Sequence, residues 1–180
     1  MIRWALYVAE RGPARTAGLS QTLAELSAQG LRAAGFMQRS LRDEAGGAGS
    51  ELLRLGGDER LTLARAASVP RGPHEEAFCS MVFDSQVFAR ARAWLAEDAP
   101  GADLLVLDEI GKLEVAGRGH HDAVLDALKG PAPVLLSVRG DQLFAALERL
   151  GLPEPRVSCE PGGSIEAFAG ALASLVREGS

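Results

Sequence analysis

The chain has 180 residues, enough for one compact domain with a sizeable core and too few for two domains of ordinary size. Hydrophobic residues make up 47% of it and charged residues 24%, which is typical of a globular protein rather than a disordered one. The net charge is −5 and the sequence has no basic block, so neither a nucleic acid nor an anionic membrane is predicted as a partner.

The sequence also bears on the cellular compartment. No apolar run approaches the length of a membrane span, and residues 1–4 do not begin a secretory signal, so a cytoplasmic location is predicted. The two cysteines, Cys79 and Cys159, lie far apart and have no metal-ligand spacing. We interpret them as reduced structural thiols rather than as a disulfide or a metal site.

The elements predicted along the chain alternate between buried strands and helices. A strand over residues 2–8, a turn at Gly12-Pro13 and a helix that stops at Gly30 are followed by a strand over 31–38. After residue 85 we predict helices over 86–97, 122–128, 143–150 and 165–175, and strands over 103–107, 134–138 and 156–159. Apolar strands that do not alternate favour a mostly parallel sheet with helices on both faces.

The stretch from about residue 39 to 84 differs from the rest in composition. Two glycine-rich turns, over 46–50 and 56–58, flank a short apolar segment, and further strands are predicted over 61–66 and 78–83. We predict a loop over 69–76. The whole chain is therefore predicted to be a single α/β domain, residues 1–180, that carries a small antiparallel β insertion.

Two acidic residues follow the most apolar predicted strand. Residues 104–107 are all Leu or Val, and Asp108 and Glu109 come directly after them. In sites of phosphoryl transfer, the first acid of such a pair holds Mg²⁺ and the second orients or deprotonates the attacking water. The alternative is an acidic strand end that caps a helix or lies in an exposed turn.

The first strand is followed by a loop that partly matches a phosphate-binding loop. Such a loop has a glycine, four residues, a second glycine, a lysine and a hydroxyl residue. Residues 9–16 read Ala-Glu-Arg-Gly-Pro-Ala-Arg-Thr, so Ala9 and Ala14 replace both glycines and Arg15 replaces the lysine. Gly12 and Thr16 retain an internal glycine and the hydroxyl. An ordinary strand-to-helix turn is the alternative interpretation.

The order of these two segments is that of P-loop proteins, and the acidic segment is the more specific of them. The sequence Asp-Glu-Ile-Gly-Lys-Leu-Glu over residues 108–114 resembles the signature of the small single-domain nucleoside-triphosphatases first described from thermophiles. The segments 61–65, 88–91 and 117–119 resemble an uncharacterised bacterial branch of that family. The resemblance covers nearly the whole chain.

The resemblance implies a RecA-like P-loop NTPase fold and slow hydrolysis of ATP or GTP with Mg²⁺. It assigns Glu109 as the catalytic base and Thr16 and Asp108 as metal ligands. It also implies nucleotide contacts for the loop residues Gly12, Pro13, Ala14, Arg15 and Thr16. Lys112 matches the family signature, and we expect it either to bind phosphate or to have a structural role. The sequence departs from the family in its altered loop and near the C-terminus, where residues 158–163 lack an Asn-Arg-Asp-type segment.

The sequence thus predicts a nucleotide-binding protein with at most slow Mg²⁺-dependent hydrolysis. The alternative is a catalytically degenerate P-loop module with a binding or regulatory role, and its protein partner is left unidentified. A small-molecule kinase, with the β insertion shaping an acceptor site, is a third hypothesis. The neighbours His120 and His121 are not expected to bind a metal together. Arg139 is expected to be solvated unless it is a trans-acting arginine finger, and Trp4 and Trp94 are expected to pack in the core or at its edge.

Overall fold

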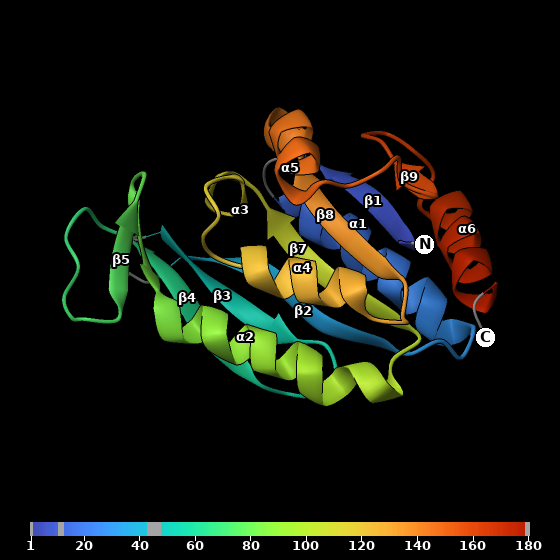
Figure 1. Cartoon of the computed structure of the whole chain (residues 1–180), viewed down its shortest axis with the longest axis horizontal. Coiled ribbons are helices and arrows are strands. Elements are labelled where there is room, and N and C mark those ends of the chain that lie inside the picture. The colour runs from blue at the N-terminus through green and yellow to red at the C-terminus, as the bar shows by residue number, and fades with distance from the viewer. Residues whose placement is uncertain (1, 11–12, 43–47, 179–180) are drawn as a thin grey trace.

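In the computed structural model, which describes residues 2–10, 13–42 and 48–178, nine strands form one sheet in the order β5-β6-β4-β3-β2-β7-β8-β1-β9 (Figure 1). The strands are β1 (Trp4–Ala9), β2 (Ala33–Arg42), β3 (Ala48–Arg54), β4 (Arg60–Ala66), β5 (Glu75–Phe78), β6 (Met81–Asp84), β7 (Leu104–Ile110), β8 (Val134–Arg139) and β9 (Val157–Cys159). The sheet therefore includes both the predicted strands of the first and last thirds and those of the middle segment.

The sheet is mixed, with a parallel half and an antiparallel half. The strands β9, β1, β8, β7 and β2 run parallel, as expected for buried strands without alternation. Strand β3 pairs antiparallel with the outer edge of β2, and β4, β6 and β5 follow it in that order and continue the same sheet. The prediction of a mostly parallel sheet is thus correct for one half. The antiparallel strands form the other half of the same sheet and are more than a small insertion.

Helices cover both faces of the sheet, as predicted. One face packs on α1 (Pro13–Ala28) and α6 (Ile165–Arg177), and the other packs on α2 (Ser85–Asp98), α4 (His121–Lys129) and α5 (Leu143–Leu150). The short helix α3 (Lys112–Val115) and the 3₁₀ turns Ala99–Gly101 and Gly140–Gln142 complete the chain. Trp4 and Trp94 are fully buried, which confirms their predicted place in the core.

Strand β2 joins the two halves of the sheet and is longer than its parallel neighbour. Residues 33–36 pair with β7, whereas residues 36–42 pair with β3. At Gly35 the backbone has φ +108°, and a Cβ atom there would lie 2.1 Å from the carbonyl oxygen of Val106. Only glycine allows β2 and β7 to approach this closely. Beyond Phe36, β2 extends past β7 toward the antiparallel strands.

One predicted strand is wrong in the middle segment. Residues 78–83 were predicted as a single strand, but β5 and β6 form a hairpin whose turn contains Cys79 at φ +54°. A positive φ at a non-glycine residue leaves no turn signal in the sequence, which explains the error. Residues 46 and 47 of the predicted glycine-rich turn over 46–50 lie outside the described residues, and residues 48–50 belong to β3. Both cysteines are free, and Cys79 is exposed rather than structural.

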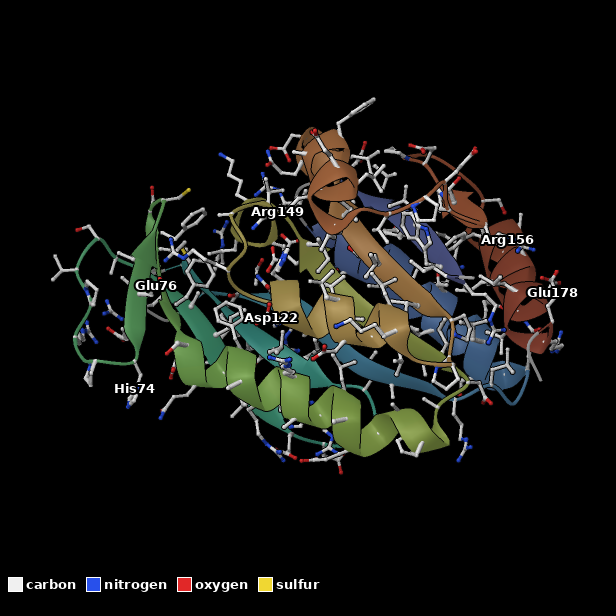
Figure 2. The ribbon with its side chains drawn as sticks, viewed as in Figure 1. His74, Glu76, Asp122, Arg149, Arg156 and Glu178 are labelled. Carbon is white, nitrogen blue, oxygen red and sulfur yellow. The ribbon has the colours of Figure 1, made fainter. Side chains whose placement is uncertain are left out.

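Ion pairs between exposed side chains lie at the periphery of the molecule. Arg156, just before β9, lies 3.3 Å from the Glu178 carboxylate after α6, and the two side chains are seen together at the C-terminal side of the molecule (Figure 2). His74 and Glu76 lie at the opposite end, on and beside the β5 hairpin (Figure 2). Among the described residues, no helix is long and apolar enough to cross a membrane.

Candidate functional site

The acidic pair lies where β7 leaves the regular sheet. The pairing of β7 with β8 is irregular between Leu107 and Ile110, and Glu109 has φ +67°. Asp108 is fully buried, and its Oδ2 accepts a hydrogen bond of 3.0 Å from the backbone N–H of Gln38. A left-handed conformation at a non-glycine residue costs roughly 1–2 kcal/mol and is found mainly where function requires it. The pair is therefore held in a fixed and strained geometry.

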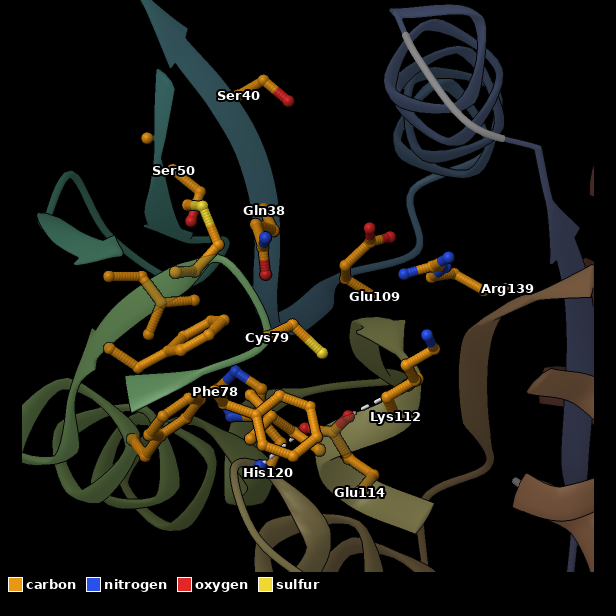
Figure 3. A pocket seen from close by; sticks show the side chains of 17 residues that line it. Gln38, Ser40, Ser50, Phe78, Cys79, Glu109, Lys112, Glu114, His120 and Arg139 are labelled. Atoms are coloured by element: carbon orange, nitrogen blue, oxygen red, sulfur yellow. Dashed lines mark hydrogen bonds between the residues drawn. The ribbon is translucent and has the colours of Figure 1, made fainter. Parts of the chain in front are cut away.

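Two cations from other elements lie on the same side as Glu109. Lys112 is exposed and opens α3, and Arg139 ends β8 opposite Ala9 of β1. The Arg139 side chain passes over Gly111, where a Cβ atom would lie 3.3 Å from its Cδ. Its guanidinium donates a hydrogen bond of 2.8 Å to Asp141. Figure 3 shows the charged ends of Glu109, Lys112 and Arg139 near one another, so Glu109 lies beside two cations.

Glu114 fixes the segment that follows the acidic pair. Its carboxylate accepts hydrogen bonds of 2.9 Å from the backbone N–H of Gly111 and of 2.9 Å from that of His120. A Cβ atom on Gly119, which has φ +61°, would lie 2.5 Å from Glu114 Oε1. Burial raises the pKa of Glu114 to about 7, because the charged form is poorly solvated there. The Glu114 side chain thus links the residue before α3 to the residue before α4.

His120 lies buried beside this loop. Its ring stacks on Phe36 at 4.2 Å between centroids and meets Phe88 edge-on at 4.7 Å. Neither ring nitrogen has a hydrogen-bond partner among the described residues. Burial lowers the pKa of His120 to about 3, so the ring is neutral near pH 7. The neighbouring His121 instead places Nδ1 2.9 Å from the carbonyl oxygen of Glu114.

The altered phosphate loop lies at the same edge of the sheet as the acidic pair. Gly12 is outside the described residues, as are the side chains of Pro13, Ala14 and Arg15. Helix α1 begins at Pro13, and Thr16 is partly buried in its first turn. Strand β8 lies between β1 and β7, so the carboxyl ends of β1 and β7 are separated by about 10 Å, two strand spacings.

A small pocket flanks the first loop on its other side. It has a volume of about 200 Å³ and lies between the end of β1, helix α1 and the loop after β9. Tyr7, Gly18 and residues 160–163 line it. A Cβ atom at Gly18 would lie 2.1 Å from the Tyr7 hydroxyl oxygen, so glycine is needed for this contact. The C-terminal segment that departs from the family pattern therefore adjoins the end of β1.

A second pocket, of about 270 Å³, lies between the antiparallel strands and the acidic pair, and we call it the insertion pocket (Figure 3). One wall is apolar and largely aromatic, and the other carries Glu109, Lys112 and Arg139. The apolar wall is formed by Leu63, Phe78, Met81, Phe83 and Phe88. Phe78 and His120 both line this pocket, and the Arg118 guanidinium lies 5.0 Å from the Phe78 ring centroid.

Comparison with known proteins identifies the family of this chain. A family profile described as "Protein of unknown function (DUF2478)" matches residues 5–148. The chain belongs to the DUF2478 family. None of the curated proteins compared with this DUF2478 chain matches it. The solution structure of a human cancer-related nucleoside triphosphatase has a TM-score of 0.58 with it at 19% identity, over 97% of this chain and 84% of that one.

The structural likeness confirms an α/β fold with a large sheet and flanking helices for this DUF2478 chain. At 19% identity it shows the fold alone. The resemblance to the thermophile nucleoside-triphosphatases, the P-loop type of the fold and the cytoplasmic location stay predictions.

Sequence reasoning did not foresee the roles of Glu114 and His120 in this DUF2478 fold. Charged and imidazole side chains next to glycines resemble an exposed turn, and only tertiary packing buries them. One signal was present in the sequence, the two glycines Gly117 and Gly119, and both take positive φ in the structure. Glycine is favoured where φ is positive or where the backbone passes close to another group. That group is the Glu114 carboxylate at Gly119.

Proposed function

We propose that this protein binds a nucleoside triphosphate with Mg²⁺ and hydrolyses it slowly, with Glu109 as the base. The observation that carries the proposal is the acidic pair: a buried Asp108 and a strained Glu109 at the carboxyl end of β7. Open α/β sheets bind their ligands beyond the carboxyl ends of the strands. The order β9-β1-β8-β7-β2, with one strand between the first-loop strand and the acidic strand, also supports the RecA-like P-loop type.

The residues present fit a Mg²⁺ ion. Mg²⁺ prefers hard oxygen ligands and usually keeps several waters, so that one or two protein oxygens and the substrate phosphates suffice. Thr16 in the first turn of α1 and Asp108 at the end of β7 offer a hydroxyl and a carboxylate at one sheet edge. When bound, the ion would neutralise charge on the phosphates.

Glu109 and the two cations have complementary roles in this proposal. The Glu109 carboxylate accepts the proton of the attacking water, which forms the new P–O bond as the bond to the nucleoside diphosphate breaks. Lys112 and Arg139 lie near Glu109 and can balance negative charge on the transferred group. The loop lysine that would contact the phosphates is replaced by Arg15. In this proposal Lys112 of α3 and Arg139 of β8 supply positive charge in its place.

The pocket beside the first loop is the place we propose for the nucleoside. Tyr7 and residues 160–163 line it next to the end of β1, so a nucleoside there would have its phosphates directed toward β8 and β7. Its volume of about 200 Å³ suits part of a nucleoside rather than a larger molecule.

The test compares Glu109→Gln with wild type and with Glu154→Gln, a matched control on an exposed loop before β9. Phosphate release from ATP and GTP with Mg²⁺ should fall at least about hundredfold in Glu109→Gln and stay unchanged in Glu154→Gln. Calorimetry should show that Glu109→Gln still binds nucleotide. Equal release by all three proteins would overturn the assignment of Glu109.

The alternative function is a nucleotide-binding or regulatory module that has lost catalysis. The observation that favours it is the first loop, in which Ala9, Ala14 and Arg15 stand where the glycines and the lysine are expected. Loss of a lysine contact to the transferred phosphoryl group should slow the chemical step strongly. The double variant Ala14→Gly with Arg15→Lys should then bind nucleotide more tightly than wild type. Robust hydrolysis by the wild-type protein would exclude this alternative.

A further inference from the structure

The insertion pocket concentrates the backbone strain of the molecule. Among the described residues, the non-glycine positions with positive φ are Cys79 and Glu109, and both line this pocket. The pairing of β3 with β4 is also irregular next to Ser50, another lining residue. Strained backbone and bulges gather at binding and catalytic sites, where they direct side chains that regular structure would point elsewhere.

Two buried polar side chains in the pocket wall lack protein partners. His120 is 2% exposed and Ser50 is 5% exposed. Within the described part of the chain, neither the two His120 ring nitrogens nor the Ser50 Oγ makes a hydrogen bond. Leaving such buried groups unpaired destabilises the fold, so a native structure that retains them needs a reason. A ligand that supplies the missing partners is such a reason.

The chemistry of the walls limits what this ligand can be. The aromatic wall, with Phe78, Phe83 and Phe88, suits a flat ring. The neutral His120 offers one donor and one acceptor, and Ser50 offers a hydroxyl, so the ring should carry heteroatoms. At about 270 Å³ the pocket falls just below the size of sites for drug-sized molecules.

The opposite wall indicates what the ligand does. Glu109, Lys112 and Arg139 line the same pocket, so a polar group on the ring would reach the base and both cations. A hydroxyl group there meets the requirement for a phosphoryl acceptor, since it can give its proton to Glu109.

We infer that the insertion pocket binds a phosphoryl acceptor, a small heteroaromatic alcohol, and that the protein is a phosphotransferase toward it. This inference rests on the proposed nucleotide site. The acceptor oxygen forms the bond to the γ-phosphorus as its proton passes to Glu109, and the bond from that phosphorus to the leaving nucleoside diphosphate breaks. The products are a phosphate monoester and the diphosphate, and water acts as acceptor only when the pocket is empty.

The first experiment tests the ligand site without nucleotide. The full chain, with ¹³C-labelled histidine, is titrated with pyridoxine, uridine and adenosine as heteroaromatic alcohols, and with benzyl alcohol and cyclohexylmethanol as probes without ring heteroatoms. At least one heteroaromatic alcohol should shift the His120 ring signals and leave those of exposed His74 in place. Failure of all three to shift His120 at millimolar concentration would overturn the site.

Variants separate recognition from folding. His120→Phe keeps an aromatic ring between Phe36 and Phe88 but removes both nitrogens, and Ser50→Ala removes only the unpaired oxygen. Each should weaken binding of the active probe at least about tenfold. His74→Phe, the matched control, should bind as wild type does. Unchanged affinity in both pocket variants would contradict recognition by these groups.

The second experiment adds Mg²⁺-ATP or Mg²⁺-GTP and follows the probe that binds by ³¹P NMR. Appearance of its phosphate monoester in wild type and not in Glu109→Gln supports the inference. If nucleotide and probe both bind but no ester forms, the acceptor role is wrong. If the probe binds while calorimetry detects no nucleotide, the proposed function and the acceptor role both fail, and the pocket is a ligand site alone.

Discussion

Two buried titratable groups, Glu114 and His120, should give the stability of this protein opposing dependences on pH. Burial raises the pKa of Glu114 from 4.5 to about 7, so the folded state favours the protonated carboxyl. The stability that this proton contributes is present in full below pH 4.5 and is lost as the pH rises toward 7. At about 1.4 kcal/mol per pH unit, the loss amounts to about 3 kcal/mol.

His120 acts in the opposite direction. Burial lowers its pKa from 6.5 to about 3, so the folded state favours the neutral ring. Its contribution is present in full above pH 6.5 and is lost as the pH falls toward 3, by about 5 kcal/mol over the whole range. Between pH 4.5 and 6.5 the two slopes are equal and opposite. These two groups together therefore leave the free energy of unfolding of the wild-type protein nearly independent of pH.

Single substitutions should expose each slope. Relative to wild type, the free energy of unfolding of Glu114→Gln should rise by about 1.4 kcal/mol per pH unit from pH 4.5 to 6.5, because only the His120 dependence remains. That of His120→Phe should fall by about the same amount per unit. Urea denaturation at half-unit pH steps, followed by fluorescence of the buried Trp4 and Trp94, measures both.

The readout is the slope and not the stability at one pH, since Glu114→Gln also loses a hydrogen bond to Gly111 or His120 at every pH. A constant offset between Glu114→Gln and wild type across the window would show that the carboxyl titrates normally in the folded state. Parallel curves for His120→Phe and wild type would likewise refute the burial argument for the imidazole.

Three further predictions concern the backbone and the core. Glu109→Gly should raise the free energy of unfolding by up to about 1 kcal/mol, because glycine relieves the strain at φ +67°, while phosphate release falls to background in the same preparation. Gly35→Ala should destabilise the fold by more than about 3 kcal/mol, since its Cβ would lie 2.1 Å from Val106 O, and thermal unfolding would show it. Leu136→Ala, at a fully buried position of β8, should cost about 2–5 kcal/mol in urea denaturation.

Each of these has a clear contrary result. A less stable Glu109→Gly would mean that the conformation of this residue is relaxed rather than strained. A Gly35→Ala protein that melts with wild type would show that β2 and β7 can separate without loss. A cost below about 1 kcal/mol for Leu136→Ala would place that side chain outside the tight core.

Much of the parallel half of the sheet could be predicted from the sequence. Buried parallel strands are short apolar runs, so β1, β7 and β8 were evident, and the carboxyl ends of these strands had to share an edge. The antiparallel half was harder. Its strands have mixed polarity, and nothing in the sequence shows that they pair with the extended end of β2.

The candidate site likewise has one part that a local sequence pattern indicates and another part that only the folded chain brings together. Asp108 and Glu109 could be located because acids directly after an apolar strand are a local pattern. The insertion pocket depends on residues from β2, β3, β5, α2 and the loop before α4, which come together only in the folded chain. The buried state of His120 depends on its contacts with Phe36 and Phe88, both distant in sequence, and no local pattern encodes such contacts.

The hydrogen bond from Gln38 to Asp108 has an evolutionary consequence. Beyond the residues of β2 that pair with β7, the Asp108 carboxylate accepts a hydrogen bond from the backbone N–H of Gln38. A descendant that lost every trace of nucleotide chemistry would still be selected to keep this acid, because its loss would remove a hydrogen bond that the partly buried backbone of β2 makes. The left-handed backbone of Glu109 instead favours replacement by glycine once its carboxylate is no longer needed for catalysis. Across related sequences, retention of the glutamate, and not of the aspartate, should therefore distinguish active lineages from inactive ones.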